Sequence, residues 1–190
     1  MWPNVLNKIS AIDEHLGLMH RGEHNTSFGI DEETSSAYHS LMAQKRAMTY
    51  FHRGFNCAQS VFAPFAERLG LSEEAALRVS SAFGAGLGRM RGTCGAFSGL
   101  CMVAGFCKGN LSGNPDDKEK IFALTRELAE RFKTEFGTLL CRELLHLNEG
   151  EQEPARPSDR TSAYYAARPC ERCVAFCAAQ AERLLEQHRL

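Results

Sequence analysis

The 190-residue chain has little net charge, one tryptophan and no long apolar run. Its 22 basic and 23 acidic residues nearly cancel, which argues against a nucleic acid or an anionic membrane surface as the partner. The longest nearly apolar run covers the 14 residues 94–107. A membrane-spanning helix needs about 18 or more, so this run predicts a buried core helix and no membrane span.

The first residues also lack the features of a targeting segment. Charges are scattered through residues 1–17, and no uninterrupted apolar stretch resembles a signal peptide. We therefore expect a cytoplasmic protein whose thiols stay reduced. The 44% hydrophobic and 24% charged residues are typical of a globular chain, which at this length buries about 70% of its surface and folds without disulfides.

No segment alternates between apolar and polar residues with the period of two that is typical of a half-buried strand. Helical stripes recur instead, and we expect an all-α bundle of about seven helices with a glycine-rich segment before a central buried helix. The expected helices cover residues 5–16, 34–53, 58–69, 73–83, 94–107, 115–136 and 170–188, with a short segment at 139–147.

Two stretches are poor in helical signals. Residues 20–33 carry turn formers, so residues 1–33 are interpreted as a helix and connector appended to a domain formed by residues 34–190. Residues 148–169 hold three of the six prolines and predict a long loop. A loop of that length in a compact domain often covers a functional site.

Cysteine is the residue that the chain has in excess. Eight cysteines are about 4% of the chain, below the 8–10% of small disulfide-rich scaffolds. Free cysteine is among the most buried residue types, so core packing is the ordinary explanation for any one of them. That explanation suits Cys101, Cys107 and Cys177, which lie in apolar helical stretches.

Four other cysteines lie at helix ends or beside a fixed charge. Cys94 begins a helix among five glycines, where the first amides and the positive end of the helix dipole favour a thiolate. Cys57 and Cys170 begin helices in the same way, and Cys141 adjoins Arg142. Thiolates bind metals and attack disulfides, so these sulfurs predict redox or metal chemistry if the bundle gathers them.

Other motifs carry less weight. The glycines at 84–88 lack the preceding strand of a nucleotide-binding loop, and Arg89 and Arg91 beside them are either solvated or offset thiolate charge. The Cys170-x-x-Cys173 pair lacks the βαβ setting of a thioredoxin-type dithiol. The seven histidines show no paired metal-ligand spacing.

Four segments, in this order, resemble the family of redox-active proteins named for the cysteine pattern C-GCAxxG-C-C. They are FNCAQSVF, FGAGLGRMRGTCGAFSG, RFKTEFGTLLCRELL and CERCVAFCAAQAERLL, and the resemblance spans residues 45–188. It implies redox activity and an iron–sulfur cluster bound by Cys57, Cys94, Cys141 and Cys170. Because Cys173 follows Cys170 closely, the sequence leaves open which of the two sulfurs is the fourth ligand.

Three hypotheses follow. The first is an iron–sulfur protein that exchanges electrons with a redox partner protein or acts on a small-molecule substrate, with enzymatic activity left open. The second is a metal-free thiol–disulfide oxidoreductase that uses the same cysteines. The third is a non-catalytic helical module with structural zinc that forms a homodimer through an apolar face.

Overall fold

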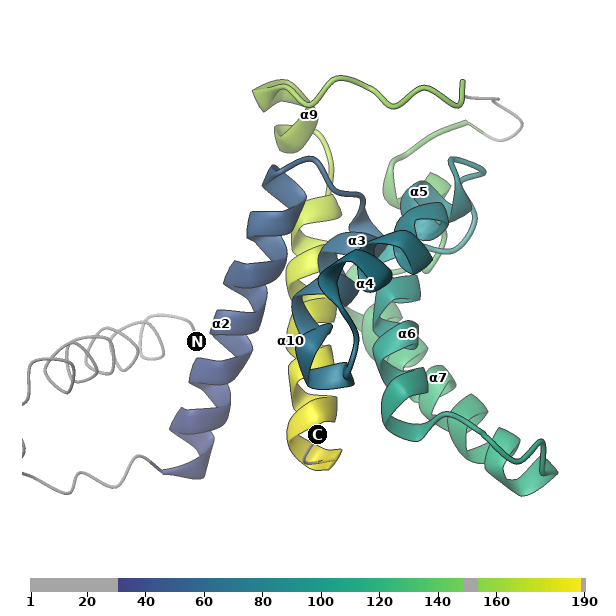
Figure 1. Cartoon of the computed structure of the whole chain (residues 1–190). Coiled ribbons are helices and arrows are strands. Elements are labelled where there is room, and N and C mark those ends of the chain that lie inside the picture. The colour runs from purple at the N-terminus through teal and green to yellow at the C-terminus, as the bar shows by residue number, and fades with distance from the viewer. Residues whose placement is uncertain (1–30, 149–153, 189–190) are drawn as a thin grey trace, which may run out of the picture.

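The structure is a computed structural model, and it describes residues 31–148 and 154–188 (Figure 1). These residues form helices and turns without a strand, apart from one isolated bridge between Thr93 and Leu140. The all-α fold predicted from the helical stripes is therefore confirmed. The helix expected at residues 5–16 lies outside the described residues. Within the described part of the chain, each helix is too short or too polar to cross a bilayer.

Two long helices run side by side through the core (Figure 1). Helix α2 (Glu32–His52) begins after Asp31, whose carboxylate accepts the Thr34 amide, and helix α10 (Cys170–His188) packs against it. Small buried residues at their contact let the two backbones approach closely. They are Ala43 and Ala47 from α2, and Val174, Ala178 and Ala181 from α10.

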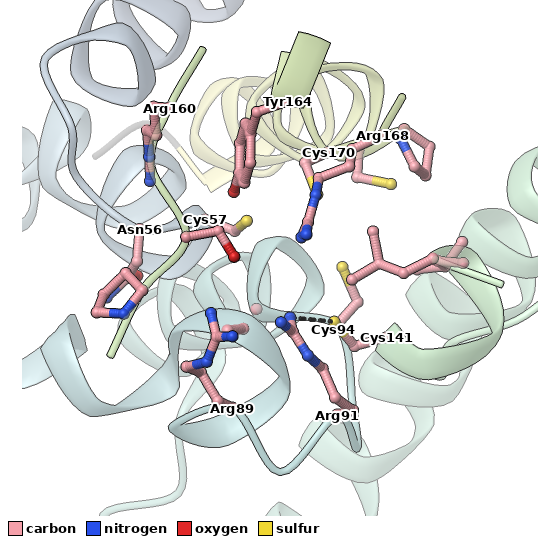
Figure 2. Close-up of a pocket in the computed structure, with 18 of the residues that line it drawn as sticks. Asn56, Cys57, Arg89, Arg91, Cys94, Cys141, Arg160, Tyr164, Arg168 and Cys170 are labelled. Carbon is pink, nitrogen blue, oxygen red and sulfur yellow. Dashed lines mark hydrogen bonds between the residues drawn. The ribbon is translucent and has the colours of Figure 1, made fainter. Parts of the chain in front are cut away.

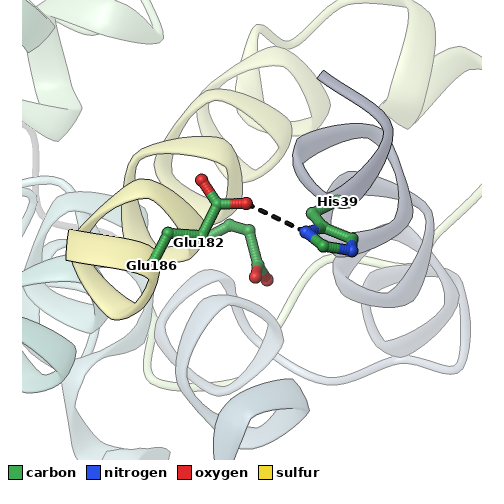
Figure 3. Close-up of side chains that lie close together, drawn as sticks. All are labelled: His39, Glu182 and Glu186. Atoms are coloured by element: carbon green, nitrogen blue, oxygen red, sulfur yellow. Dashed lines mark hydrogen bonds and ion pairs between the residues drawn. The ribbon is translucent and has the colours of Figure 1, made fainter. Parts of the chain in front are cut away.

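An ion-pair network joins the same two helices about three turns along α10 from its first residue (Figure 3). Glu182 is 3% exposed and pairs with Arg46 and Arg68, while Glu186 pairs with His39 at 3.1 Å. Among the described residues, His39, Glu182 and Glu186 form a group compact enough for a metal ion. Two arginines already neutralise Glu182, so we interpret the group as an ion-pair network.

The third helix expected from the sequence is shorter than predicted. Helix α3 (Cys57–Phe62) ends shortly before Pro64, because proline lacks the amide hydrogen that would continue the helix. A 3₁₀ turn (Ala63–Phe65) that contains Pro64 follows. A second 3₁₀ turn (Glu67–Leu69) leads to α4 (Glu73–Ser80), which has the predicted Ser72 cap, and a third (Ser81–Phe83) follows. Of these short elements, α3 packs against α2 and α10, and α4 packs against α3 (Figure 1).

The apolar run forms the buried helix α6 (Gly95–Lys108), as predicted. Gly99 lets this helix approach α3 closely, since an added Cβ would lie 2.8 Å from the Ala58 carbonyl oxygen. Helix α7 (Pro115–Phe136) starts after the Asn114 cap and ends at Gly137, and the short α8 (Cys141–Leu144) follows. The predicted loop of residues 148–169 contains a helix that the sequence did not reveal, α9 (Ser162–Ala166).

Candidate functional site

The four cysteines singled out by the sequence line one pocket of about 310 Å³, together with Cys173 (Figure 2). Cys57, Cys141 and Cys170 are the first residues of α3, α8 and α10, and Cys94 is the residue before α6. Four helix starts from separate parts of the chain therefore meet at one cavity. Cys101, Cys107 and Cys177 do not line it.

A capping box fixes the start of α3. The Asn56 carboxamide oxygen accepts the Gln59 amide at 3.0 Å, and the Gln59 side chain accepts the Asn56 amide at 3.0 Å. Asn56 also donates to the Ser81 carbonyl at 2.7 Å, which ties α3 to the turn before the glycine-rich segment. These three bonds hold the backbone of Cys57 at the wall of the pocket.

Backbone hydrogen bonds bring Cys94 and Cys141 together. The Cys94 amide donates to the Leu139 carbonyl at 2.8 Å, and the Cys141 amide donates to the Gly92 carbonyl at 2.7 Å. Residues 91–94 and 139–142 thus run alongside one another. This short pairing brings together two cysteines that are 47 positions apart in the sequence.

The glycine-rich segment forms a left-handed turn. Residues Ala85 to Arg89 all have positive φ, and the Gly88 amide donates to the Gly84 carbonyl at 2.8 Å, as in one turn of helix α5 (Gly84–Leu87). Left-handed backbone costs about 1–2 kcal/mol for each residue other than glycine. Strain of this kind is concentrated at functional sites, and this turn forms one wall of the cysteine pocket.

Arginines form the other part of the pocket lining. Four of them surround the cysteines: Arg89, Arg91, Arg160 and Arg168. The described lining residues include no Asp or Glu. Arg91 is only 4% exposed and donates to the Cys141 sulfur at 3.7 Å, so it is not a solvated residue. Arg160 and Arg168 were not predicted from the sequence. The feature of the sequence that could have indicated them is their position in the long proline-rich loop that precedes Cys170.

The loop predicted to cover a site lies over this pocket, where Pro157, Ser158 and Tyr164 contribute to the lining. Arg160 anchors it by donating to the carbonyl groups of Phe51 and of Phe55, the latter at 2.7 Å. The Arg160 guanidinium also lies 4.6 Å from the centre of the Phe51 ring. The loop is therefore attached to the end of α2.

Cys57 and Cys170 affect each other's acidity across the pocket. The neighbouring Cys57 thiol lowers the pKa of Cys170 to about 7 against the effect of burial, with help from Arg168 and Arg91. The Cys170 sulfur and burial raise the pKa of Cys57. Cys170 is therefore the more acidic thiol of the two.

Cys94 and Cys173 are the second pair of neighbouring thiols. The Cys173 thiol lowers the pKa of Cys94, and the nearby amides of Phe97 and Ala96 at the start of α6 act in the same direction. The Cys94 sulfur and burial raise the pKa of Cys173.

The expectation that Arg142 favours a Cys141 thiolate is wrong. Burial is the largest effect on Cys141 and raises its pKa to about 11, and the cation that opposes this rise is Arg91. Arg142 instead donates to the Asn148 carbonyl. Sequence adjacency misled here because consecutive residues at a helix start point in different directions.

A family model described as "Putative redox-active protein (C_GCAxxG_C_C)" matches residues 55–184. The matched region runs from just before α3 through most of α10 and includes all five cysteines of the pocket. No curated protein and no solved structure matches the chain.

Proposed function

The chain belongs to the C_GCAxxG_C_C family of redox-active proteins, and from this premise we propose that its cysteine pocket binds an iron–sulfur cluster. The cluster would serve electron transfer to a partner protein or redox chemistry on a small substrate. One observation carries the proposal: five thiols from four helix starts converge on one cavity, and the other charged groups among its described lining residues are arginines. Cysteine sulfur is the common protein ligand of such clusters.

The spacing of the sulfurs favours a cluster over a single zinc ion. Four cysteines around one tetrahedral zinc bring their sulfurs to about 3.8 Å from one another, given Zn–S bonds of about 2.3 Å. Among the described residues, no three cysteines have their sulfurs within 4.8 Å of one another. In a [4Fe–4S] cluster each cysteine binds a different iron ion, so the ligand sulfurs lie farther apart than they do around one zinc ion.

Each part of the pocket has a role in this proposal. Cys57, Cys94, Cys141 and Cys170 would hold the cluster, which supplies one-electron transfer when bound. The N-terminal ends of α6 and α10 stabilise negative charge at Cys94 and Cys170. Arg91 offsets the charge of Cys141, and the loop attached by Arg160 limits the access of water.

We propose Cys170 as the fourth ligand and Cys173 as a thiol that lies beside the cluster without binding it. Cys170 is the first residue of α10, whereas Cys173 lies one turn farther in and is 2% exposed. Cys173 lowers the pKa of Cys94, which is how a thiol beside a cluster ligand would tune it. If Cys170 is replaced, the nearby Cys173 sulfur is expected to substitute in part.

Anaerobic purification tests the proposal directly. Brown protein that contains iron and acid-labile sulfide is expected, and colourless protein free of iron would reject the cluster. Elemental analysis of the same sample distinguishes iron from zinc, which would support the structural-zinc hypothesis instead. Cys57→Ser, Cys94→Ser and Cys141→Ser should each abolish iron retention, because a lost ligand opens the site to solvent.

Cys101→Ser and Cys107→Ser are the matched controls. Both sulfurs lie on α6, the helix that follows Cys94, and neither lines the pocket. Iron per folded molecule should remain that of the wild type, although a buried hydroxyl costs some stability. Loss of iron in these controls with retention in Cys57→Ser and Cys94→Ser would overturn the ligand assignment.

The two sulfur pairs favour one alternative function. In thiol–disulfide exchange without metal, Cys57 with Cys170 or Cys94 with Cys173 would pass two electrons and two protons to a substrate disulfide and become a disulfide. Mass spectrometry of iron-free protein after mild oxidation should then find a reversible loss of two hydrogen atoms in one of these pairs. Thiols that stay reduced under that treatment would reject this alternative.

A further inference from the structure

We propose that the Tyr164 hydroxyl donates a hydrogen bond to a sulfur of the bound iron–sulfur cluster or of its cysteine ligands and raises the reduction potential of the centre. The inference rests on the proposed function and deepens it. It assigns to a residue of the covering loop the control of how readily the centre accepts an electron.

The Tyr164 side chain reaches the cysteine pocket. Tyr164 belongs to the pocket lining, and Figure 2 shows its hydroxyl directed from the loop into the cavity. Burial raises the pKa of Tyr164, and negative charge at Cys170 and Cys57 raises it further. Arg160 and Arg168 oppose this rise without cancelling it. The phenol therefore keeps its proton near neutral pH and is a hydrogen-bond donor.

The hydroxyl has no hydrogen-bond partner among the described residues. Tyr164 forms a hydrogen bond through its backbone amide instead, which donates to the Thr161 hydroxyl oxygen at 3.2 Å. A tyrosine hydroxyl that is withdrawn from solvent usually has an acceptor, because a buried donor without one costs free energy. A cluster in the cavity supplies that acceptor through its sulfur atoms.

The other hydroxyl and carboxamide groups of the described lining are already used or exposed. The Asn56 side chain donates to the Ser81 carbonyl at 2.7 Å, and the Gln59 side chain donates to a carbonyl of α4 at 3.0 Å. Ser158 is exposed to solvent. Among these groups, the Tyr164 hydroxyl is therefore the one that is available to a cofactor.

The Tyr164 ring is held in place without the help of its hydroxyl. The Arg168 guanidinium lies 4.4 Å from the centre of the ring, and the Tyr165 ring meets it edge-on with the centroids 5.4 Å apart. Tyr165 packs edge-on against Phe51 of α2 at 5.9 Å. A phenylalanine keeps all these contacts, so Tyr164→Phe removes the donor and leaves the loop in position.

A donor at this position favours the reduced state. Reduction adds one negative charge to the centre, and a hydrogen bond to sulfur stabilises the more negative state more strongly. The low dielectric constant of a covered pocket increases this difference. Loss of the donor should therefore lower the reduction potential without removing a ligand.

Potentiometric titration of anaerobically purified full-length protein tests this role, with dithionite as the reductant and the visible absorbance of the cluster as the signal. Tyr164→Phe should keep the iron content of the wild type. Its ratio of reduced to oxidised cluster at the wild-type midpoint should fall about tenfold, which corresponds to about 59 mV for one electron. In D₂O, the iron–sulfur stretching bands of the resonance Raman spectrum should shift more in the wild type than in Tyr164→Phe.

Tyr165→Phe is the matched control, since Tyr165 is the next residue of α9 and is also half-buried but does not line the pocket. Its ratio should stay within twofold of the wild type. Equal potentials in wild type and Tyr164→Phe, or the same shift in both variants, would overturn the donor role and leave the cluster assignment intact. Loss of iron from Tyr164→Phe alone would overturn it too, because a group that tunes the cluster does not hold it. Iron-free wild-type protein would reject the cluster and the donor role together.

Discussion

The left-handed turn contains two glycines, Gly86 and Gly88, that allow its steric contribution to stability to be measured separately from its backbone strain. Gly86 has a φ of 67°, and an added Cβ would lie 2.7 Å from the Cys141 Cβ and 2.9 Å from the Gly92 nitrogen. Gly88 has a φ of 57°, but the nearest atom to an added Cβ is 3.8 Å away. Both positions carry the backbone penalty of an alanine, and only Gly86 adds a steric clash.

The expected sizes follow from these two effects. Left-handed backbone costs an alanine about 1–2 kcal/mol, so Gly88→Ala should lower the free energy of unfolding by that amount. Overpacking adds about 1–3 kcal/mol, so Gly86→Ala should lose about 2–5 kcal/mol in total. Because the clash is with Cys141, Gly86→Ala should also lower the iron content per folded molecule, whereas Gly88→Ala should not.

Urea denaturation followed by circular dichroism measures both stabilities, and iron analysis of the folded fraction measures the site. The midpoint of Gly86→Ala should lie clearly below that of Gly88→Ala, with similar slopes. Equal midpoints for the two variants would refute the close contact between the turn and α8. Equal loss of iron in both variants would show that Cys141 is not positioned by this contact.

Three further predictions concern the covering loop, one buried thiol and the core. Arg160→Ala removes two charge-assisted bonds to the end of α2, so amides in residues 154–169 should exchange hydrogen faster, and unchanged exchange would contradict the anchoring. Burial raises the pKa of Cys101 to about 11 from its ordinary value near 9, so the folded protein keeps this thiol protonated at a pH where the unfolded chain loses the proton. The free energy of unfolding, measured by urea midpoints, should therefore fall between about pH 9 and pH 11, and it should fall less in Cys101→Ala. Glu182→Ala removes the buried carboxylate that pairs with two arginines, which are themselves 50% and 32% exposed, so it should cost about 1–3 kcal/mol while iron per folded molecule stays constant.

Much of the fold could be predicted from the sequence because helix signals are local. Ser72 and Asn114 cap helices, Gly137 ends one, and the apolar run from residue 95 is buried, all of which depend on neighbours within a few positions. The predicted helix across residues 58–69 was too long because one proline outweighed an otherwise helical stripe. Helix α9 was missed because it is five residues long and has no buried residue, so it leaves no periodic signal.

The cysteines of the pocket and the loop that covers it could be predicted from the sequence, but its arginines could not. A position at a helix start is a local feature of the sequence. Cys57, Cys94, Cys141 and Cys170 could therefore be singled out without knowing that the fold brings them together. The arginines could not be ranked in this way, since Arg142 and Arg168 each lie within two residues of a cysteine and only one of them lines the pocket. Which arginine faces the sulfurs depends on tertiary pairing.

The strained turn is held in place by its surroundings rather than by its own sequence. Gly95 lies so close to the preceding turn that an added Cβ would be 2.9 Å from the Phe83 carbonyl oxygen, and the Cys141 amide holds Gly92 from the other side. Buried helix α6 and the start of α8 therefore fix both ends of the segment, and packing offsets the cost of its left-handed residues. Because Arg89 and Arg91 are carried by this segment, their approach to the cysteines is set by the backbone. In the proposed cluster site, cofactor retention is therefore expected to depend on the fit of the same few glycines.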